Sequence, residues 1–537
     1  MMRTFSRRLR VVWLALLLLT TLVVPASLAQ ASPRDAGALG QVVPVPASVQ
    51  PDAANPYQLS PMAAVSFDIR SPQARQIAET LAGQLRTATG YPLPVVPATQ
   101  FYQPTGISLL LGGVDGKLGD EAYQLRSSKQ GVVIKANAAA GLFRGVQTLK
   151  QLLPAKALAK TKQQGPFGVP GGTILDHPRY GYRSAMLDVA RHFFTVPEVE
   201  SYIDEIAQYK INYLHLHLTD SQGWRIQIDG WPKLTEIGGS SGVGGERTGF
   251  YTQADYSKIV EYAQQRFITV VPEIEGPSHS NAARSSYAGL NCDGKTPPLW
   301  LDITESPNSV LCLTNGTAYK MMDDVIRQLA KITPGPYINI AGDEVDKVDK
   351  TQYAEYVNKV SAMVAKYGKK VMGWQETLSV AKPEGMTGQF WFNELNDDAV
   401  IKAAKAGAKV VMSPADHAYL DMKYDENNPA YPVGNYWAGF VEVQDSYNWD
   451  PETQLAGLPA NAISGVSAAM FTELVFERKD IDQLAFPRLA AIGEIGWSPK
   501  STHDWDSFKT RLAAQGPHMD VAGIDYYRSP QIPWPAR

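Results

Sequence analysis

Cysteine, histidine and an excess of positive charge are all scarce in this chain. Among 537 residues there are 2 cysteines and 8 histidines, and 50 basic against 53 acidic residues give a formal net charge of -3. Without a basic excess, the composition argues against a nucleic-acid partner. Cys292 and Cys312 have no partners at metal-ligand spacing, which leaves one disulfide as the simplest expectation for an exported chain.

A run long enough to span a membrane is also missing from the N-terminal segment. Residues 1–31 begin with four arginines, continue through a mostly apolar stretch over 11–24 and end in small residues. That stretch is shorter than the roughly 20 residues of a spanning helix. The pattern predicts a secretory signal cleaved near Ala29 or Ala31, and hence a secreted protein without a stable membrane span. Removing its four positive charges from -3 leaves a net charge of about -7.

The remaining chain, in a sequence that is 44% hydrophobic, is long enough for two domains with full cores. Residues 41–173 predict a small α+β domain without a catalytic constellation, and 161–172, rich in Gln, Gly and Pro, read as a linker. The expected strands are 64–69, 107–111, 123–125 and 131–135, and the expected helices are 72–87 and 141–153.

Eight apolar strand-like segments follow the linker, with helical stretches between several of them. They are 184–189, 213–218, 268–274, 337–341, 370–373, 388–392, 409–412 and 465–470. Alternating strand and helix signals imply a parallel sheet, and eight such units predict an α/β fold of the (β/α)8 TIM-barrel type. We place this domain at 178–520, with a C-terminal extension to 537.

The strand predicted at 337–341 delivers two adjacent acids, Asp343 and Glu344, at its C-terminal end. Active sites of such barrels gather at that end of the strands, which suggests acid-catalysed chemistry. The alternative is a helix N-terminus, where acids are favoured by the helix dipole.

The other strand ends also carry polar or aromatic residues. They are Asp188 with Arg191, Asp220, Glu273 with His279, Trp374, Trp391, Tyr419 with Asp421, and Glu473. Carboxylates and aromatic rings on one rim suit a carbohydrate. His215 and His217 share one face and raise a metal-dependent hydrolase as an alternative, but eight histidines supply no obvious ligand set, so barrel-core packing is favoured and no metal or cofactor is expected.

Four motifs in this order resemble the β-N-acetylhexosaminidases of glycoside hydrolase family 20, most closely the secreted bacterial members. They are Tyr182-Arg-Ser-Ala-Met-Leu-Asp-Val-Ala-Arg-His-Phe-Phe194, His215-Leu-His-Leu-Thr-Asp-Ser-Gln-Gly-Trp-Arg225, Pro272-Glu-Ile-Glu-Gly-Pro-Ser-His279 and Gly342-Asp-Glu344. The similarity runs from about Val43 to the C-terminus.

The resemblance implies substrate-assisted catalysis, an exception to the two-carboxylate scheme of most glycosidases. The 2-acetamido oxygen attacks the anomeric carbon to give an oxazolinium-type intermediate, which water opens with net retention. Glu344 is then the general acid and Asp343 binds the acetamido N–H. His279 and Asp220 form a relay behind Glu344, whose pKa we expect to be raised by burial and by its acidic neighbour.

The resemblance also assigns a sugar pocket. Arg183 should clamp O3 and O4, and Asp421 and Glu473 should bind O4 and O6. The Tyr419 hydroxyl should orient the acetamido oxygen. The aromatic residues would be Trp374 and Trp391 around the acetamido methyl, and Trp437 on the leaving sugar, although packing of the tryptophans in the core is the alternative.

Several positions depart from the family's usual pattern. Phe471 stands where a tryptophan usually completes the aromatic cage, and Ser221 replaces a common second aspartate. Further differences beside the predicted site are Glu275, Ser278, Asn339 and Ala341.

The expected function is release of terminal N-acetylglucosamine, or N-acetylgalactosamine, from chitooligosaccharides or glycans by an exo-acting enzyme. The alternative is a sugar-binding protein on the same fold that has lost turnover. Intact Asp343, Glu344, His279 and Tyr419 argue against that alternative, because a lectin needs no tuned acid.

Overall fold

The structure is a computed structural model that describes residues 37–98, 105–307, 309–426 and 432–536. The predicted signal, residues 1–31, lies outside the described residues. In the part that is described, every helix is too short or too polar to cross a membrane.

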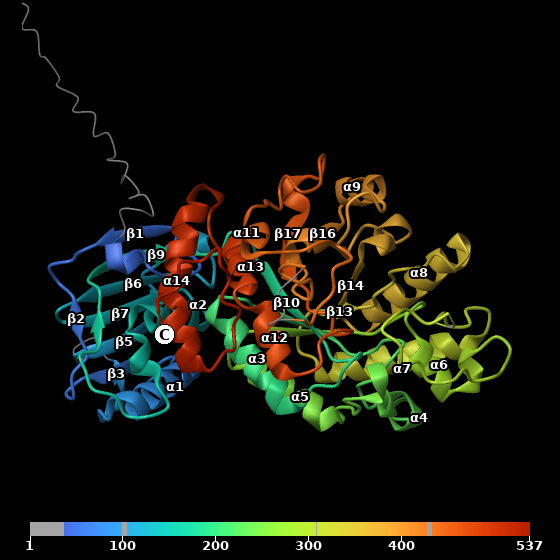
Figure 1. Ribbon diagram of the computed structural model, residues 1–537, viewed down its shortest axis with the longest axis horizontal. Coiled ribbons are helices and arrows are strands. Elements are labelled where there is room, and N and C mark those ends of the chain that lie inside the picture. The colour runs from blue at the N-terminus through green and yellow to red at the C-terminus, as the bar shows by residue number, and fades with distance from the viewer. Residues whose placement is uncertain (1–36, 99–104, 308, 427–431, 537) are drawn as a thin grey trace, which may run out of the picture. The chain divides into compact units, whose positions relative to one another are not determined.

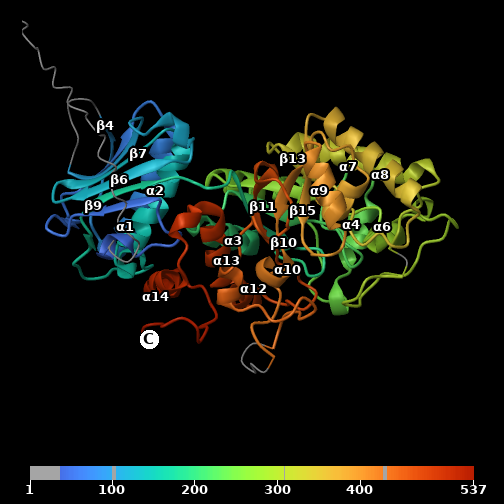
Figure 2. The ribbon, with the colours of Figure 1, turned by 90° about the horizontal axis from the view of Figure 1, so that it is seen from above.

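The N-terminal domain contains a seven-stranded mixed sheet in the order β1-β9-β6-β7-β5-β3-β4. Its helices α1 and α2 pack against each other and against the sheet (Figures 1 and 2). A separate pair, β2 and β8, is antiparallel. The elements are β1 (Ser48–Pro51), β2 (Tyr57–Gln58), β3 (Ala64–Asp68), α1 (Pro72–Thr89), β4 (Val95–Ala98), β5 (Gly106–Leu111), β6 (Tyr123–Ser128), β7 (Gly131–Ala136), α2 (Ala139–Leu152), β8 (Gly168–Val169) and β9 (Gly172–Asp176).

Eight parallel strands close the second sheet into a barrel, in chain order from β10 to β17. The predicted fold class is thereby confirmed. The strands are β10 (Tyr182–Asp188), β11 (Tyr213–His217), β12 (Thr269–Glu273), β13 (Tyr337–Asn339), β14 (Lys370–Trp374), β15 (Met386–Phe390), β16 (Lys409–Met412) and β17 (Ile463–Ala468).

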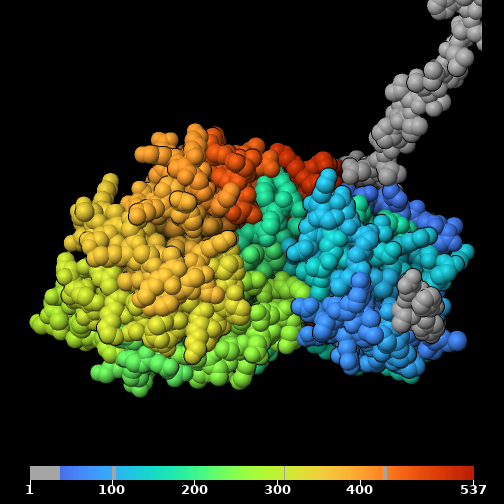
Figure 3. Space-filling view, turned by 180° about the vertical axis from the view of Figure 1, so that it is seen from behind, coloured from blue at the N-terminus to red at the C-terminus, as the bar shows by residue number. Residues whose placement is uncertain are grey.

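Helices surround these strands (Figures 1 and 2). They are α3 (Val196–Gln208), α4 (Lys233–Glu236), α5 (Gln253–Gln264), α6 (Asn281–Ser286), α7 (Gly316–Ile332), α8 (Lys350–Lys366), α9 (Asp397–Lys405), α10 (Ala415–Ala418), α11 (Val443–Tyr447), α12 (Arg478–Ala485) and α13 (Arg488–Trp497). The last helix, α14 (Trp505–Ala522), packs against the short helical turn Ala155–Leu158 of the N-terminal domain. The space-filling view shows the outer surface of this ring, with the yellow segment around α7 and α8 covering one side (Figure 3).

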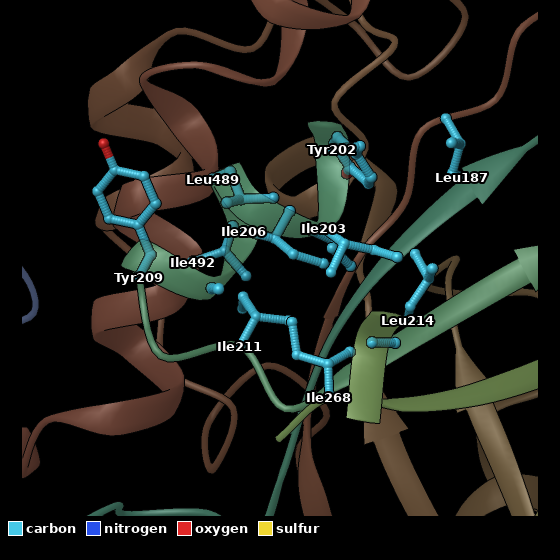
Figure 4. Close-up of a cluster of buried hydrophobic side chains, with 14 of the residues drawn as sticks. Leu187, Tyr202, Ile203, Ile206, Tyr209, Ile211, Leu214, Ile268, Leu489 and Ile492 are labelled. Atoms are coloured by element: carbon cyan, nitrogen blue, oxygen red, sulfur yellow. The ribbon is translucent and has the colours of Figure 1, made fainter. Parts of the chain in front are cut away.

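Sequence periodicity explains how the helices attach to the barrel. The apolar side chains of α3 recur every three or four residues, as in Tyr202, Ile203 and Ile206, and all three are fully buried. They meet Leu214 of β11 and Leu489 of α13 in one apolar cluster (Figure 4). This packing holds the strands in place, so that residues at their C-terminal ends are positioned by a rigid scaffold.

A buried ionic cluster joins the N-terminal domain to the barrel. Glu121 accepts hydrogen bonds from Arg144 of α2 at 2.9 Å and from Arg183 of β10 at 2.7 Å, and both arginine side chains are fully buried. Arg144 also donates to the Phe267 carbonyl at 2.9 Å. Burial opposes ionisation of Glu121, but the two guanidinium groups outweigh it and lower its pKa.

Candidate active site

The two predicted catalytic acids lie on a turn directly after β13. Within residues 341–344, three of the four have left-handed backbone angles, with φ of 54° at Ala341, 88° at Gly342 and 48° at Glu344. Residues other than glycine adopt this region at a cost, and such strain clusters at functional sites. A Cβ on Gly342 would lie 2.6 Å from the Thr377 side chain, so the turn needs glycine there. The turn presents both carboxylates on the same rim of the barrel.

His279 stands between this acid pair and the carboxylate of Asp220. Its Nδ1 is 3.3 Å from Asp220 Oδ1, and its Nε2 is 3.2 Å from Glu344 Oε2 and 3.8 Å from Asp343 Oδ2. Burial disfavours a charged imidazole here, but the surrounding carboxylates outweigh burial and hold the pKa of His279 well above its usual range. The structure therefore brings the predicted relay of His279 and Asp220 together with both members of the acid pair.

A second histidine, His217, extends the relay into the barrel. Its Nε2 is 3.0 Å from Asp220 Oδ2 and its Nδ1 is 2.5 Å from Glu273 Oε2. Glu273 also contacts His215 Nε2 at 2.9 Å and accepts a hydrogen bond from Trp374 Nε1 at 2.8 Å. Core packing is thus only part of the role of His215 and His217. Through Glu273, His217 connects Trp374 in the pocket wall to Asp220, the carboxylate behind the acid. The only sequence signal for this connection was the position of Glu273 at the end of its strand.

The pKa shifts of the two acids are the reverse of the expectation. Contact with His279 lowers the pKa of Glu344, whose side chain is 52% exposed. Burial and the nearby carboxylates raise the pKa of Asp343, which is 16% exposed, to about 8. The prediction of a raised pKa for Glu344 is wrong because sequence alone does not show the cation beside it. Without substrate, Asp343 is the member of the pair that carries a proton at neutral pH.

Arg183 does not lie at the rim, and its predicted role as a sugar clamp is wrong. It is the second residue of β10, and its guanidinium donates to the carbonyls of Tyr180 and Lys210 and to Glu121. That end of the barrel faces the N-terminal domain. The motif contains a second arginine just beyond the other end of β10, Arg191, which sequence analysis placed on the rim without assigning it a role.

Arg191, in contrast to Arg183, lies at the rim beside the relay. It contacts Asp188 at 3.2 Å, Asp220 at 2.8 Å and Glu473 at 3.4 Å, and its guanidinium lies 5.4 Å from the Phe471 ring centre. The guanidinium thus connects the relay to the far wall of the pocket.

Glu473 lies beside Arg191, and Asp421 lies near Glu473, so the two carboxyls form a second acidic edge. Burial, followed by the charge of Glu473, raises the pKa of Asp421 to about 8. Glu473 Oε2 is buried without a hydrogen-bond partner among the described residues, as is Asp343 Oδ1. Buried polar atoms in a folded protein are normally paired, so these oxygens are available to hydroxyl or amide donors of a ligand.

The predicted aromatic residues form one continuous wall. The ring centres of Trp374 and Phe471 are 5.9 Å apart, those of Tyr419 and Phe471 5.4 Å, and those of Trp391 and Tyr419 6.5 Å. Trp437 lies 5.6 Å from Tyr419 and is 50% exposed. Trp374 and Tyr419 are buried, Trp391 and Phe471 are partly buried, and with the exposed Trp437 they give the wall an enclosed part and an outer part.

Glu376 is a neighbour of the acid pair that sequence analysis missed. Its Oε1 accepts a bond from the Glu344 backbone N–H at 3.3 Å, and its Oε2 accepts one from Trp391 Nε1 at 3.1 Å. It follows β14 by two residues, which was the available signal. Glu376 fixes the general-acid candidate relative to the aromatic wall.

Two groups of side chains have potential metal-ligand atoms within 4.8 Å of one another: His217, Glu273 and Glu275, and Asp220, His279 and Glu305. In both groups carboxylates outweigh the effect of burial and hold the pKa of the histidine well above its usual range. A protonated imidazole carries hydrogen on both nitrogens and is a donor, whereas a metal requires a free lone pair. The groups therefore fit charged hydrogen-bonded chains better than metal-ligand sets.

A cavity of about 530 Å³ lies away from the acid pair, between α1 and α2 of the N-terminal domain and α3 and α14. Glutamines and apolar residues line most of it, and none of the predicted site residues is among them. We assign it no part in the chemistry.

Comparison with known families agrees with this geometry. Residues 180–500 match the model of "Glycosyl hydrolase family 20, catalytic domain", and residues 40–177 match that of "Glycosyl hydrolase family 20, domain 2". The chain belongs to glycosyl hydrolase family 20. The first match covers the barrel and the second the N-terminal sheet.

Several family 20 proteins are similar over nearly the whole chain. The β-N-acetylhexosaminidase of Cellulomonas fimi is 38% identical over 494 residues, which is 92% of this chain and 97% of that protein. The solved β-N-acetylhexosaminidase of Streptomyces coelicolor A3(2) superposes with a TM-score of 0.89 at 48% identity, covering 93% of this chain and 99% of the other. A mutant Streptomyces plicatus β-hexosaminidase in complex with the product GlcNAc gives 0.88 at 49% identity, with coverage of 93% and 98%. These family 20 relatives are glycoside hydrolases, and the chain is an enzyme of that class.

Proposed function

We propose that this enzyme removes terminal non-reducing N-acetylglucosamine, or N-acetylgalactosamine, from chitooligosaccharides or glycans by an exo-acting, retaining, substrate-assisted mechanism. The observation that carries the proposal is the unpaired oxygen of Asp343 beside the enclosed aromatic wall. An acetamido group has an N–H for that oxygen and a methyl group for the rings. A plain hexose offers neither.

The protonation states support a substrate-triggered proton shift. Asp343 holds the proton in the free enzyme because its pKa is about 8, whereas the pKa of Glu344 is lowered by His279. When an acetamido N–H donates to Asp343, the ionised form of that carboxylate is favoured. The proton then moves within the cluster to Glu344, and His279 Nε2 faces both carboxylates for this transfer. Substrate binding thereby protonates Glu344, the acid that the reaction needs.

Glu344 then donates its proton to the leaving oxygen while the acetamido oxygen attacks the anomeric carbon. The C–O bond to the leaving group breaks, and the intermediate carries positive charge that the Asp343 carboxylate stabilises. Glu344, now ionised, takes a proton from the water that opens the ring, which restores its acid form. The buried Tyr419, on the same wall, would orient the acetamido oxygen.

The sugar hydroxyls distant from the reacting carbon would be bound by Arg191, Asp421 and Glu473. Arg191 is the donor of the set, and the two carboxyls are acceptors when ionised. The exposed Trp437 would stack on the leaving sugar.

The testing experiment compares p-nitrophenyl N-acetyl-β-glucosaminide with the plain β-glucoside, each with and without a chelator. We expect rapid turnover of the first alone, because only that substrate has the acetamido nucleophile, and no loss on chelation. A folded protein that binds the sugar without turnover would instead be the sugar-binding alternative. Equal turnover of both glycosides would exclude substrate assistance.

We also propose that the enzyme is exported and loses its N-terminal segment. The charge, apolar stretch and small residues of 1–31 support this proposal, and the disulfide between Cys292 and Cys312 fits an oxidising compartment. The intact mass of protein recovered from the medium should correspond to cleavage near Ala29 or Ala31. Recovery of the full-length chain from the cells alone would contradict export.

A further inference from the structure

We infer that Glu305 positions His279 and stabilises its positive charge, and that it thereby influences the acid pair. This inference rests on the proposed function. Glu305 Oε2 lies 2.9 Å from His279 Nδ1, closer than the 3.3 Å of Asp220 Oδ1. The ring N–H makes its hydrogen bond with Asp220, so Glu305 acts as a charge contact beside that bond.

The free acceptor capacity of the two carboxylates differs. Both oxygens of Asp220 are already engaged, by the Ser221 N–H at 2.5 Å, by His217 at 3.0 Å and by Arg191 at 2.8 Å. Among the described residues, Glu305 has one other hydrogen-bond partner, the Ser221 hydroxyl, at 3.1 and 3.3 Å from its two oxygens, and Arg191 acts on it only as a more distant charge. Donors to a carboxylate reduce the field that it exerts on a further cation. Glu305 is the less neutralised of the two charges that face Nδ1.

Ser221 is one of the positions that depart from the usual family pattern. A hydroxyl there can donate to Glu305, whereas a carboxylate would repel it. The serine and the glutamate therefore form a matched pair in this chain.

The loop around Glu305 is anchored on both flanks. The Gln222 side chain donates to the carbonyls of Asp302 at 2.9 Å and Thr304 at 3.2 Å, and Ser306 Oγ donates to Asn281 Oδ1 at 3.0 Å. The predicted disulfide between Cys292 and Cys312 is present and closes the loop at its base. These contacts hold Glu305, which is 25% exposed, over a histidine that is 5% exposed.

Other charged groups also act on His279 from the elements around it. Asp220 follows β11, Asp343 and Glu344 follow β13, Glu275 follows β12, and Arg191 and His217 act through Asp220. Replacement of Glu305 removes a single negative charge from this set and leaves the others in place.

The experiment is Glu305→Gln, with Asp293→Asn as a matched control, since Asp293 lies on the same loop and is exposed. The imidazole of His279 is followed by NMR in the absence of substrate, with His279→Gln used to assign its signals. We expect Glu305→Gln to lower the pKa of His279 by about one unit, the low end for a partly exposed charge contact. Because the charge of His279 lowers the pKa of both Asp343 and Glu344, a less charged His279 should move the high-pH limb of kcat/KM to higher pH. Asp293→Asn should change neither quantity. Glu305→Asp, which keeps the charge, should leave the pKa of His279 close to its wild-type value.

A double variant, Cys292→Ser with Cys312→Ser, tests the loop. We expect its pH profile to move in the same direction as that of Glu305→Gln, with no further shift when the three changes are combined. An unmoved His279 titration in Glu305→Gln would overturn the inference, even if the rate fell equally at every pH. The titration needs no turnover, so it decides this inference separately from the proposed hydrolysis.

Discussion

Replacement of Glu344 with glutamine is expected to lower kcat about 10³-fold on an N-acetylglucosamine disaccharide, and far less on the p-nitrophenyl glycoside. Positioned proton transfer contributes roughly 10²- to 10⁴-fold in enzymes, and a sugar alkoxide cannot leave without a proton. A nitrophenolate is a stable anion and needs little help. The amide keeps the size of Glu344 but holds no transferable proton.

The measurement is kcat for both substrates in the wild type, in Glu344→Gln and in Asp346→Asn. Asp346 is an exposed carboxylate two residues away and serves as the matched control. Equal losses on both substrates would show that Glu344 does not protonate the leaving group.

Replacement of Asp343 with asparagine should lower kcat by about 10²- to 10³-fold on both substrates, because it removes the charge that stabilises the intermediate rather than the proton donor. The pH profile should also change. Wild-type kcat/KM should fall as pH rises through about 8, where Asp343 loses the shared proton. In Asp343→Asn that proton must stay on Glu344, whose pKa is lowered. The high-pH limb should therefore move to a pH below the ordinary range of a glutamate.

Thermal unfolding provides the control for Asp343→Asn. The pKa of Asp343 is raised from 3.8 to about 8 on folding, so the folded state binds more protons between these values. Wild-type stability should consequently decrease as pH rises through this window, and the asparagine variant should lack this contribution. A variant less stable than wild type at pH 9 would contradict the raised pKa of Asp343, because only the wild type then carries a buried ionised carboxylate at this position.

The barrel could be predicted from sequence because its strands are buried on both faces and appear as continuous apolar runs. All eight strands lie within two residues of the predicted bounds at their N-terminal ends, and β16 matches at both ends. The short strands β1, β2, β4, β8 and β9 were missed, and β8 falls inside the predicted linker. Their existence depends on partners distant in the chain, such as the pairing of β1 with β9, which local periodicity does not show.

The residues of the site also include some that could be predicted from sequence and some that could not. Residues at strand ends, such as Asp220 and Tyr419, could be located because the barrel dictates where they converge. Arg183 and Arg191 belong to one motif, but they lie at opposite ends of β10. Only the path of that strand shows that Arg183 faces the N-terminal domain and Arg191 the rim. Glu305 comes from an irregular loop with no periodic signal, and the lowered pKa of Glu344 requires the actual position of His279.

The ionic cluster around Glu121 has a consequence for dissecting the enzyme. A fragment cut at the boundary between the two matched family domains would keep Arg183 and lose the carboxylate that neutralises it. Removing one partner of a buried ion pair typically costs about 3–5 kcal/mol. Lys210, also buried, would lose Asp176 in the same cut. The N-terminal domain therefore supplies the counter-ions for buried cations of the barrel, and a transplantable catalytic unit must include residues on both sides of the domain boundary.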